Sequence, residues 1–242
     1  MNSLPKALLL DLDDTILSLN SDSDGEWLQI SREFADHFGA VPLHELHAAF
    51  LDSRDWFWRE MERVRWGRLH FSLAPREIVL RALARFDITD TPLVHRMAAR
   101  YNHIREAAVS PLPGAIETLQ RLKDMDSRLG MLTNGSSEGQ RAKIERFSLA
   151  PFFDHIQIEG EFGIGKPDAR VFQHALDALS VEPADAWMVG DNLDADIRGA
   201  QQVGIYAVWV DAQGNGPPDG STVRPDMTIR QLSDLVKASI LD

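Results

Sequence analysis

The chain contains no cysteine among its 242 residues. Disulfide bonds, thiol nucleophiles and thiolate metal sites are therefore excluded. The sequence also lacks an apolar run of the ~18 residues that a membrane-spanning helix needs. The four-residue apolar patch before Asp11 is too short for a secretory signal. We therefore expect a cytoplasmic protein without a membrane partner.

Positive charge is scarce as well. Lys and Arg together number 25 against 37 Asp and Glu, and the formal net charge is −12. This balance argues against a nucleic-acid partner bound through a basic surface. If the substrate is an anion, local cations or a metal ion must overcome the overall negative field.

The apolar residues follow two kinds of pattern along the chain, one typical of strands and one typical of helices. Residues 6–12 have the pattern of a buried strand, whereas residues 25–108 show apolar side chains at helical spacing without a convincing strand. After "SPLPG" (110–114), strand-like segments alternate with helical ones. These predicted helices lie near residues 115–125, 137–147, 167–179 and 194–202, and a last one ends the chain.

Strands that alternate with helices predict an α/β fold with a parallel sheet covered on both faces, that is, a doubly wound sheet. The helical region directly follows the first strand, so we expect an all-helical domain inserted there. The predicted boundaries are 1–17 and 110–242 for the α/β core and 18–109 for the insertion. Such sheets bind ligands at the carboxyl ends of their strands.

Acidic and polar side chains follow three of the predicted strands. They are Asp11 and Asp13, Thr133 and Asn134, and Asp191 with Asn192 and Asp196. Because the carboxyl ends of parallel strands share an edge, we expect these carboxylates to converge. Oxygen ligands without Cys or clustered His suit a hard cation, most plausibly Mg²⁺, which would offset their repulsion. For any single Asp the alternative is a helix or turn cap.

A lysine stands in "GEFGIGKPDARVF" (160–172), which partly matches a phosphate-binding P-loop. The match fails at Pro167, which replaces the hydroxyl residue that would hold Mg²⁺. We interpret Pro167 as the first residue of a helix, where a missing N–H costs little. Lys166 would then reach an anion at the carboxylate edge.

The motifs "DLDDT", "TNG", "KP" and "GDNLDAD", in this order, resemble the four sequence motifs of the haloacid dehalogenase superfamily. The helices after the first motif resemble the C1 cap of its subfamily I. The resemblance covers essentially the whole chain. It implies a Rossmann-like core and a Mg²⁺-dependent phosphatase that acts through an aspartyl-phosphate on a small phosphorylated metabolite.

The resemblance also implies a role for each matching residue. Asp11 would be the nucleophile, and Asp13 the general acid and base whose backbone carbonyl contacts the metal. Thr133 and the Asn134 backbone would hold phosphoryl oxygens. Lys166 would be the neutralising cation, and Asp191 would bind the metal together with Asp11 and Asp13. Asn192 and Asp196 are weaker candidates for the same site. Many relatives carry Gly at position 14, so Asp14 is interpreted as a turn residue.

Other activities on the same scaffold remain open. A dehalogenase lacks the second Asp because a halide needs no proton, so Asp13 favours phosphate substrates. A phosphonate-cleaving enzyme would need a cap lysine, and no lysine occurs between Thr15 and Ser110. A sugar-phosphate mutase is the closest alternative. A signalling receiver is an alternative from another class, but it has no helical insertion after its first strand.

The segment "RDWFWREMERVRWGRLHF" (54–71) carries five arginines and three tryptophans. Helical spacing places Phe57, Met61 and Val64 on one face, and Arg59, Arg63 and Trp66 on another. The apolar face could pack in the core while the charged face is solvated. Alternatively, one arginine or tryptophan of the segment could face the active site and contact the leaving group. The linker at 18–25 would let the cap hinge. The substrate and the choice between monomer and homodimer stay open.

Overall fold

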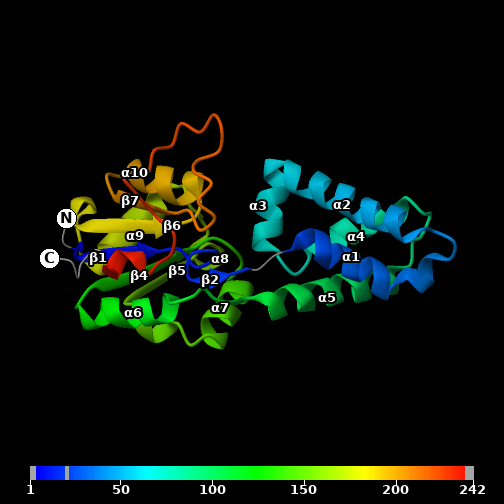
Figure 1. The fold of residues 1–242 in the computed structure, drawn as a ribbon, viewed down its shortest axis with the longest axis horizontal. Coiled ribbons are helices and arrows are strands. Elements are labelled where there is room, and N and C mark those ends of the chain that lie inside the picture. Colours follow the sequence, from blue (N-terminus) through cyan, green and yellow to red (C-terminus); the bar gives the residue numbers. More distant parts are fainter. Residues whose placement is uncertain (1–3, 20–21, 238–242) are drawn as a thin grey trace. The chain divides into compact units, whose positions relative to one another are not determined.

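The computed structural model describes residues 4–19 and 22–237 (Figure 1). The chain divides into two compact units, one formed by Met1–Ser18 with Ser110–Asp242 and the other by Leu19–Val109. Residues 20 and 21 of the predicted hinge lie outside the described residues. Across 4–19 and 22–237, no helix combines the length and the apolar character that a membrane crossing requires.

In the described part of the first unit, six parallel strands form one sheet in the order β5-β4-β1-β6-β7-β8. The strands are β1 (Ala7–Leu10), β4 (Arg128–Thr133), β5 (His155–Ile158), β6 (Ala186–Gly190), β7 (Tyr206–Val210) and β8 (Met227–Ile229). Leu10 of β1 lies opposite Met131 of β4 and Val189 of β6. The carboxyl ends of β4, β1 and β6 are therefore neighbours, at the point where the strand order changes direction.

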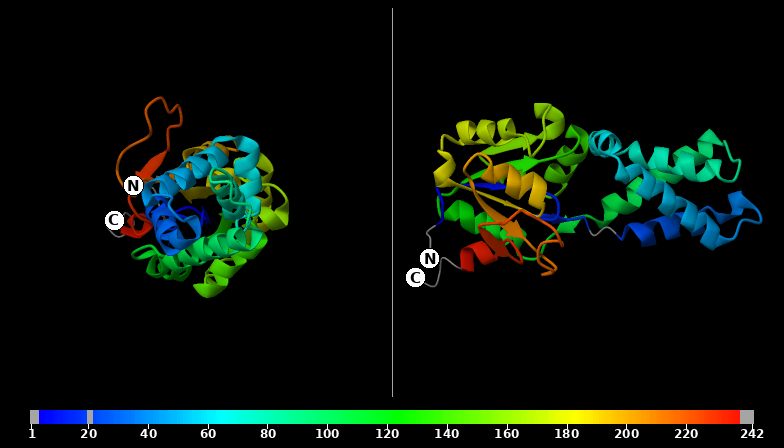
Figure 2. Two further views of the ribbon diagram at one scale, coloured as in Figure 1. Left: turned by 90° about the vertical axis from the view of Figure 1, so that its right-hand side faces the viewer. Right: turned by 90° about the horizontal axis from the view of Figure 1, so that it is seen from above.

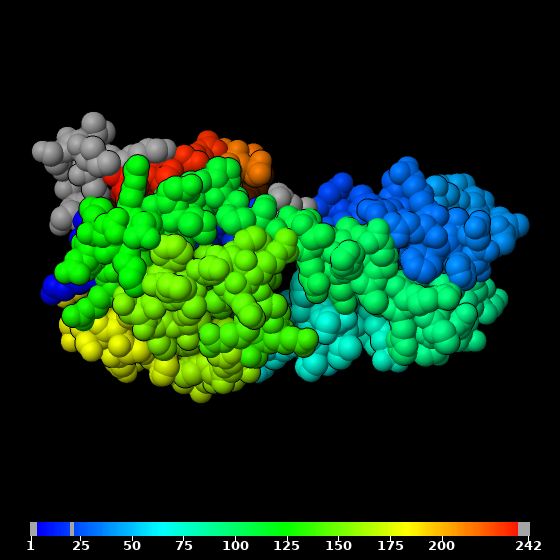
Figure 3. Space-filling model, turned by 90° about the horizontal axis from the view of Figure 1, so that it is seen from below, coloured from blue at the N-terminus to red at the C-terminus, as the bar shows by residue number. Residues whose placement is uncertain are grey.

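Helices cover both faces of this sheet, as the doubly wound prediction requires. Helices α6 (Ala115–Asp124) and α7 (Ser137–Arg146) lie on the face shown in green in Figure 3, with α11 (Asp234–Lys237) beside α6. On the other face, α9 (Ala169–Leu179) and α10 (Gly199–Gln201) bury Phe172 and Leu176 against Leu9 and Met188. All four residues of β1 are fully buried, which explains their uninterrupted apolar run.

Short elements complete the first unit. They are β2 (Leu17–Ser18), paired antiparallel with β3 (Ser110–Pro111); the helix α8 (Glu159–Phe162); the 3₁₀ turns η2 (Ala150–Phe152) and η3 (Pro183–Asp185); and the π-helix η4 (Leu193–Arg198). The pairing of β2 with β3 joins the two points at which the chain leaves and re-enters this unit. The helical segment is thus an insertion between two adjacent strands.

One predicted helix start is wrong. Helix α9 begins at Ala169 and not at Pro167, because the Asp168 side chain accepts the Arg170 N–H at 3.0 Å and caps the helix. The predicted helix near 194–202 is the π-helix η4 followed by α10. The start at Leu193 agrees with the prediction, and the Asn192 side chain caps it.

The second unit is all-helical, as the spacing predicted. Its helices are α1 (Ser23–Glu33), α2 (Leu43–Arg59), α3 (Met61–Leu69), α4 (Ala74–Ala84) and α5 (Thr91–Ala108), with a 3₁₀ turn η1 (Ala35–Phe38). Helices α1, α2, α4 and α5 pack side by side (Figure 2). At their centre the Trp27 ring stacks on Phe50 and Tyr101, with centroids 5.1 and 4.0 Å away. These buried rings give the unit its own core.

The predicted stripe of Phe57, Met61 and Val64 is wrong. Helix α2 ends at Arg59, Glu60 is extended, and α3 starts at Met61. Phe57 is buried, but Met61 is 83% exposed, because the break at Glu60 interrupts the helical period. Arg63 stabilises the break by donating a 2.7 Å hydrogen bond to the carbonyl oxygen of Trp56, and its guanidinium lies 4.1 Å above the Trp56 ring.

Candidate active site

The carboxyl ends of β1 and β6 bring acidic side chains together. Asp11 follows β1, and its N–H donates to the Val189 carbonyl at 3.0 Å. Asp191 follows β6, and Asp196 lies on η4. One carboxylate oxygen from each of these residues lies within 4.8 Å of the other two. The predicted convergence of Asp11 and Asp191 is therefore present, and Asp196 joins it at the centre.

Asp196 fits here because the residue that precedes Asp191 is Gly190. A Cβ added at position 190 would overlap the Asp196 carboxylate. That carboxylate is 1% exposed and accepts the Asn192 N–H at 3.0 Å. The sequence prediction ranked Asp196 among the weaker candidates because its position in the chain suggested a surface cap.

Lys166 lies between two of these carboxylates. Its Nζ donates to Asp11 Oδ1 at 2.6 Å and pairs with Asp196 Oδ1 at 2.7 Å. A third contact, 2.6 Å long, goes to the Leu132 carbonyl oxygen at the end of β4. Since Lys166 is 3% exposed, its charge is directed at the acidic cluster and not at solvent.

The Asn134 side chain fixes the backbone of Lys166. Its Nδ2 donates to the Lys166 carbonyl at 2.9 Å, and its Oδ1 accepts the Lys166 N–H at 2.8 Å. This paired contact ties the loop before α9 to the end of β4. Asn134 was predicted for its backbone, and the structure adds this function for its side chain.

The site holds an excess of negative charge. Burial raises the pKa of Asp11 well above its ordinary value, and Asp196 and Asp191 raise it further against the opposing effect of Lys166. Burial also raises the pKa of Asp191 to about 7, with contributions from Asp196 and Asp14. Burial alone would lower the pKa of Lys166, but Asp11 and Asp196 outweigh it and raise this pKa.

Asp13 has different partners from Asp11. Lys143 Nζ of α7 lies 2.7 and 2.8 Å from its two carboxylate oxygens, and Gln140 Nε2 donates to Oδ2 at 3.1 Å. Gln140 also donates to the Thr133 hydroxyl oxygen. Sequence reasoning missed both α7 residues. Their three-residue spacing, which places two long polar side chains on one helix face, was the available signal.

Asn192 and Asp14 have local structural functions. The Asn192 Oδ1 accepts the N–H groups of Asp194 at 3.0 Å and Ala195 at 2.9 Å, so this side chain caps η4. Asp14 adopts a left-handed conformation with φ 55°, which suits the predicted turn residue. Its charge nevertheless contributes to the raised pKa of Asp191.

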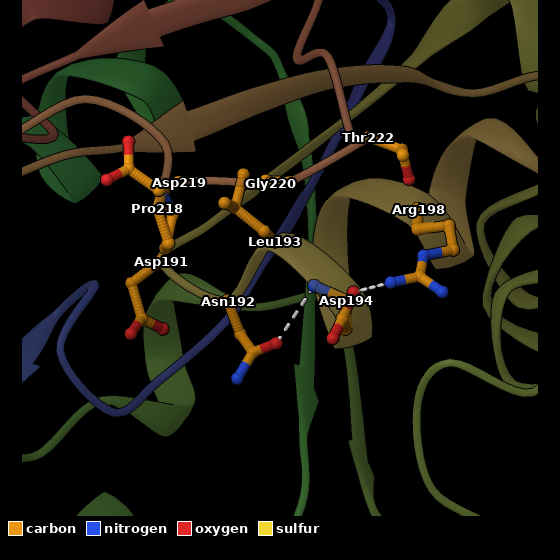
Figure 4. A pocket seen from close by; sticks show the side chains of 10 residues that line it. Asp191, Asn192, Leu193, Asp194, Arg198, Pro218, Asp219, Gly220 and Thr222 are labelled. Carbon is orange, nitrogen blue, oxygen red and sulfur yellow. Dashed lines mark hydrogen bonds and ion pairs between the residues drawn. The ribbon is translucent and has the colours of Figure 1, made fainter.

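A pocket of about 510 Å³ opens beside Asp191 (Figure 4). The start of η4 forms one wall, where Arg198 pairs with Asp194, and the loop 218–222 forms another. The base of this loop is held by Asp211, whose carboxylate accepts backbone N–H groups of Gly214 and Gly216. A ligand at Asp191 therefore has room on this side of the site.

The donor set fits a hard divalent cation. Asp11, Asp191 and Asp196 offer carboxylate oxygens, the ligands that Mg²⁺ prefers. Burial raises the pKa values of Asp11 and Asp191, and repulsion from the neighbouring carboxylates raises them further. A cation at this point would stabilise the ionised carboxylates.

Comparison with known proteins shows the family of this chain. The model of the family described as haloacid dehalogenase-like hydrolase matches residues 5–204. A phosphoserine phosphatase from Thermus thermophilus is 34% identical over 98% of this chain and 100% of its own length. A glyceraldehyde 3-phosphate phosphatase from Methanopyrus kandleri is 31% identical over 96% of this chain and 97% of its own.

A solved structure shares the architecture. The crystal structure of a 2-haloacid dehalogenase from Pseudomonas syringae pv. Tomato has a TM-score of 0.66 and 26% sequence identity, over 98% of this chain and 99% of that one. The chain belongs to the haloacid dehalogenase-like hydrolase family. This result confirms the family that the four motifs predicted, and with it an enzyme of the hydrolase class.

Proposed function

We propose that this protein is a Mg²⁺-dependent phosphatase that hydrolyses a small phosphomonoester through an aspartyl-phosphate. The observation that carries the proposal is the separate placement of two carboxylates. Asp11 is buried beside Lys166 and the acidic cluster, whereas Asp13 is held apart by Lys143. A nucleophile and a general acid need this separation. The phosphatase names of the two relatives support the same substrate class.

In this proposal Mg²⁺ would be held by Asp11, Asp191, Asp196 and the backbone carbonyl of Asp13, and when bound it would screen the repulsion between the carboxylates and the phosphate. The protein groups would perform the remaining steps. Lys166 would neutralise charge on Asp11 and on the transferring phosphoryl group. The Asn134 side chain would keep Lys166 in place through its two backbone hydrogen bonds.

The reaction would take place in two displacements. An Asp11 oxygen would attack phosphorus while the ester P–O bond breaks and Asp13 gives a proton to the leaving oxygen. Asp13 would then take a proton from water as the water oxygen attacks phosphorus and the bond to Asp11 breaks. The Thr133 hydroxyl and the Asn134 backbone N–H would bind phosphoryl oxygens. The products are an alcohol and inorganic phosphate.

The surroundings of Asp13 favour this reaction over dehalogenation, although a structural neighbour is a dehalogenase. A halide leaves without a proton, so a dehalogenase does not need a general acid. Here Lys143 holds the second carboxylate, that of Asp13, by a hydrogen bond, as a general acid would require. A mutase would use the same groups and return the phosphate to the sugar. A phospho-accepting receiver would retain the phosphate on the protein.

We further propose that residues 1–17 and 110–242 form the catalytic core and that residues 18–109 form a cap. A cap built from α1–α5 would restrict the substrate to a small phosphorylated metabolite. This proposal is supported by the separate hydrophobic core of the helical unit, which lets it act as a rigid body.

The test is a phosphate-release screen of small phosphomonoesters with Mg²⁺ and with EDTA. Wild type should release phosphate in Mg²⁺ but not in EDTA, and Asp11→Asn should release none in either condition. The matched control is Asp185→Asn, which removes an exposed carboxylate that pairs with Lys6 before the start of β6, and it should keep its activity. Full Mg²⁺-dependent turnover by Asp11→Asn would refute the mechanism. Halide release from a 2-haloacid without phosphate release would assign the protein to the dehalogenases.

A further inference from the structure

Helix α7 presents two side chains to the predicted catalytic groups. The amide Nε2 of Gln140 donates to Asp13 Oδ2 at 3.1 Å and to the Thr133 hydroxyl oxygen. On the same helix, Lys143 Nζ donates to both oxygens of Asp13 at 2.7 and 2.8 Å. Gln140 thus links a residue at the end of β1 to a residue at the end of β4.

The chemistry of Asp13 determines which way the Gln140 amide points. Both Asp13 oxygens accept hydrogen bonds from Lys143 Nζ, and Oδ2 also accepts one from the Gln140 amide NH₂, so the amide nitrogen and not its oxygen faces Asp13. The same nitrogen carries a second hydrogen, which is directed at the Thr133 oxygen. That oxygen therefore acts as an acceptor toward Gln140, and its own O–H is left to donate elsewhere. A phosphoryl oxygen is the acceptor that the proposed reaction provides.

The start of α7 holds Gln140 in this orientation. Ser136 caps the helix by accepting the Gly139 N–H at 3.2 Å. Gly135 has a φ of 136°, and a Cβ at this position would lie 3.2 Å from the Gln140 Cδ. Gln140 is 4% exposed, so its amide has little freedom to rotate. The buried amide is a fixed part of the site and not a surface group that happens to touch it.

We propose that Gln140 and Lys143 are positioning residues that place the Asp13 carboxylate and orient the Thr133 hydroxyl. The inference rests on the proposed phosphatase function and adds two residues to it. Lys143 acts through its ion pair with Asp13. Gln140 acts through Asp13 and Thr133 together, and the two residues therefore have different kinetic signatures.

The experiment compares two leaving groups. p-Nitrophenyl phosphate releases a phenolate that needs no proton. Phosphoserine, or the alkyl ester that the screen ranks first, releases an alkoxide that needs a proton from Asp13. Lys143→Met should lower kcat/KM for the alkyl ester by about tenfold or more, part of the roughly 10²–10⁴-fold that general acid–base catalysis supplies. For p-nitrophenyl phosphate its loss should stay within about threefold. Lys143→Arg should restore much of the alkyl-ester activity.

Gln140→Met should lower kcat/KM for both esters by about tenfold or more, because phosphate binding by Thr133 is also disturbed. Gln140→Glu keeps the volume, replaces the donors with acceptors and should show the same loss if the Met variant folds poorly. The controls are Arg141→Met, which removes an exposed α7 ion pair with Glu161, and Gln173→Met on α9. Both controls should match wild type for both esters.

A double-mutant cycle separates positioning from a structural effect. In an Asp13→Asn background, Lys143→Met should cause no further loss in first-turnover cleavage of the alkyl ester, while Gln140→Met should still cause one. Equal losses on both esters for Lys143→Met, or wild-type kinetics for Gln140→Met, would overturn the inference. Absence of phosphate release by wild type would instead overturn the proposed function, so the two failures are distinguishable.

Discussion

Replacement of Asp191 by Asn should make the metal-free protein more stable at pH 8 while removing its response to Mg²⁺. Burial and the charges of Asp196 and Asp14 raise the pKa of Asp191 to about 7. The unfolded chain has the ordinary carboxyl value of 3.8. Between these two values the folded state holds a proton that the unfolded state has lost, so stability falls as the pH rises from 4 to 7. Above pH 7 Asp191 is ionised in the folded state as well, and its buried charge then destabilises the folded state by the full amount.

The magnitude follows from the difference between the two pKa values. At ~1.4 kcal/mol for each pKa unit, the ionised Asp191 costs the folded state about 4 kcal/mol at most. An Asn side chain relieves the charge repulsion but keeps part of the burial cost, so the expected gain is on the order of 2 kcal/mol. For a protein of this size that corresponds to a rise in melting temperature of roughly 4–8 °C.

The assay is thermal unfolding of wild type, Asp191→Asn and the control Asp185→Asn, in EDTA and in Mg²⁺, at pH 5 and pH 8. Asp191→Asn should exceed wild type in EDTA at pH 8 and gain much less at pH 5, where Asp191 is already protonated in the folded state. Mg²⁺ should stabilise wild type and the control but not Asp191→Asn. Equal melting temperatures for wild type and Asp191→Asn at pH 8 in EDTA would refute the explanation that burial and neighbouring carboxylates destabilise the ionised Asp191.

Three further substitutions test individual contacts. Lys166→Met should lower the free energy of unfolding by about 3–5 kcal/mol, measured by urea denaturation, because it leaves Asp11 and Asp196 buried without their cation. Gly190→Ala should reduce kcat at least about tenfold with the fold retained by circular dichroism, because its Cβ displaces the Asp196 carboxylate. Asn134→Ala should lower kcat more than it raises KM in steady-state assays and destabilise the protein by about 1–3 kcal/mol, since the Lys166 backbone loses both hydrogen bonds.

The strand ends of this fold could be predicted from the sequence because strands buried on both faces form continuous apolar runs that end at a polar residue. Asp11 and Asp191 follow uninterrupted apolar runs, and parallel pairing then places them at one edge. Lys166 follows no strand directly. Its position came from the order of the motifs, and its contact with Asp11 depends on the loop that Asn134 fixes.

The contacts that the sequence did not predict depend on how helices are rotated. Gln140 and Lys143 reach Asp13 only because α7 turns that face toward the end of β1, and no local pattern specifies that rotation. Asp196 likewise resembles a surface residue at the start of a helix until Gly190 makes room for it. The break at Glu60 was missed because each half of the segment has good helical spacing on its own.

The charges at the strand ends explain why a divalent cation suits this site. The carboxylates that converge there belong to Asp11, Asp191 and Asp196, and Lys166 pairs with two of them. Asp13 lies apart from this cluster and pairs with Lys143. Fully ionised, these groups carry a formal charge of −2, and both lysines are already engaged by carboxylates. A phosphate anion would therefore be repelled by the ionised site. One divalent cation brings the sum to zero, whereas a monovalent cation leaves a negative site. Phosphate release should accordingly fail with K⁺ or Na⁺ as the added cation at any concentration that leaves the fold intact.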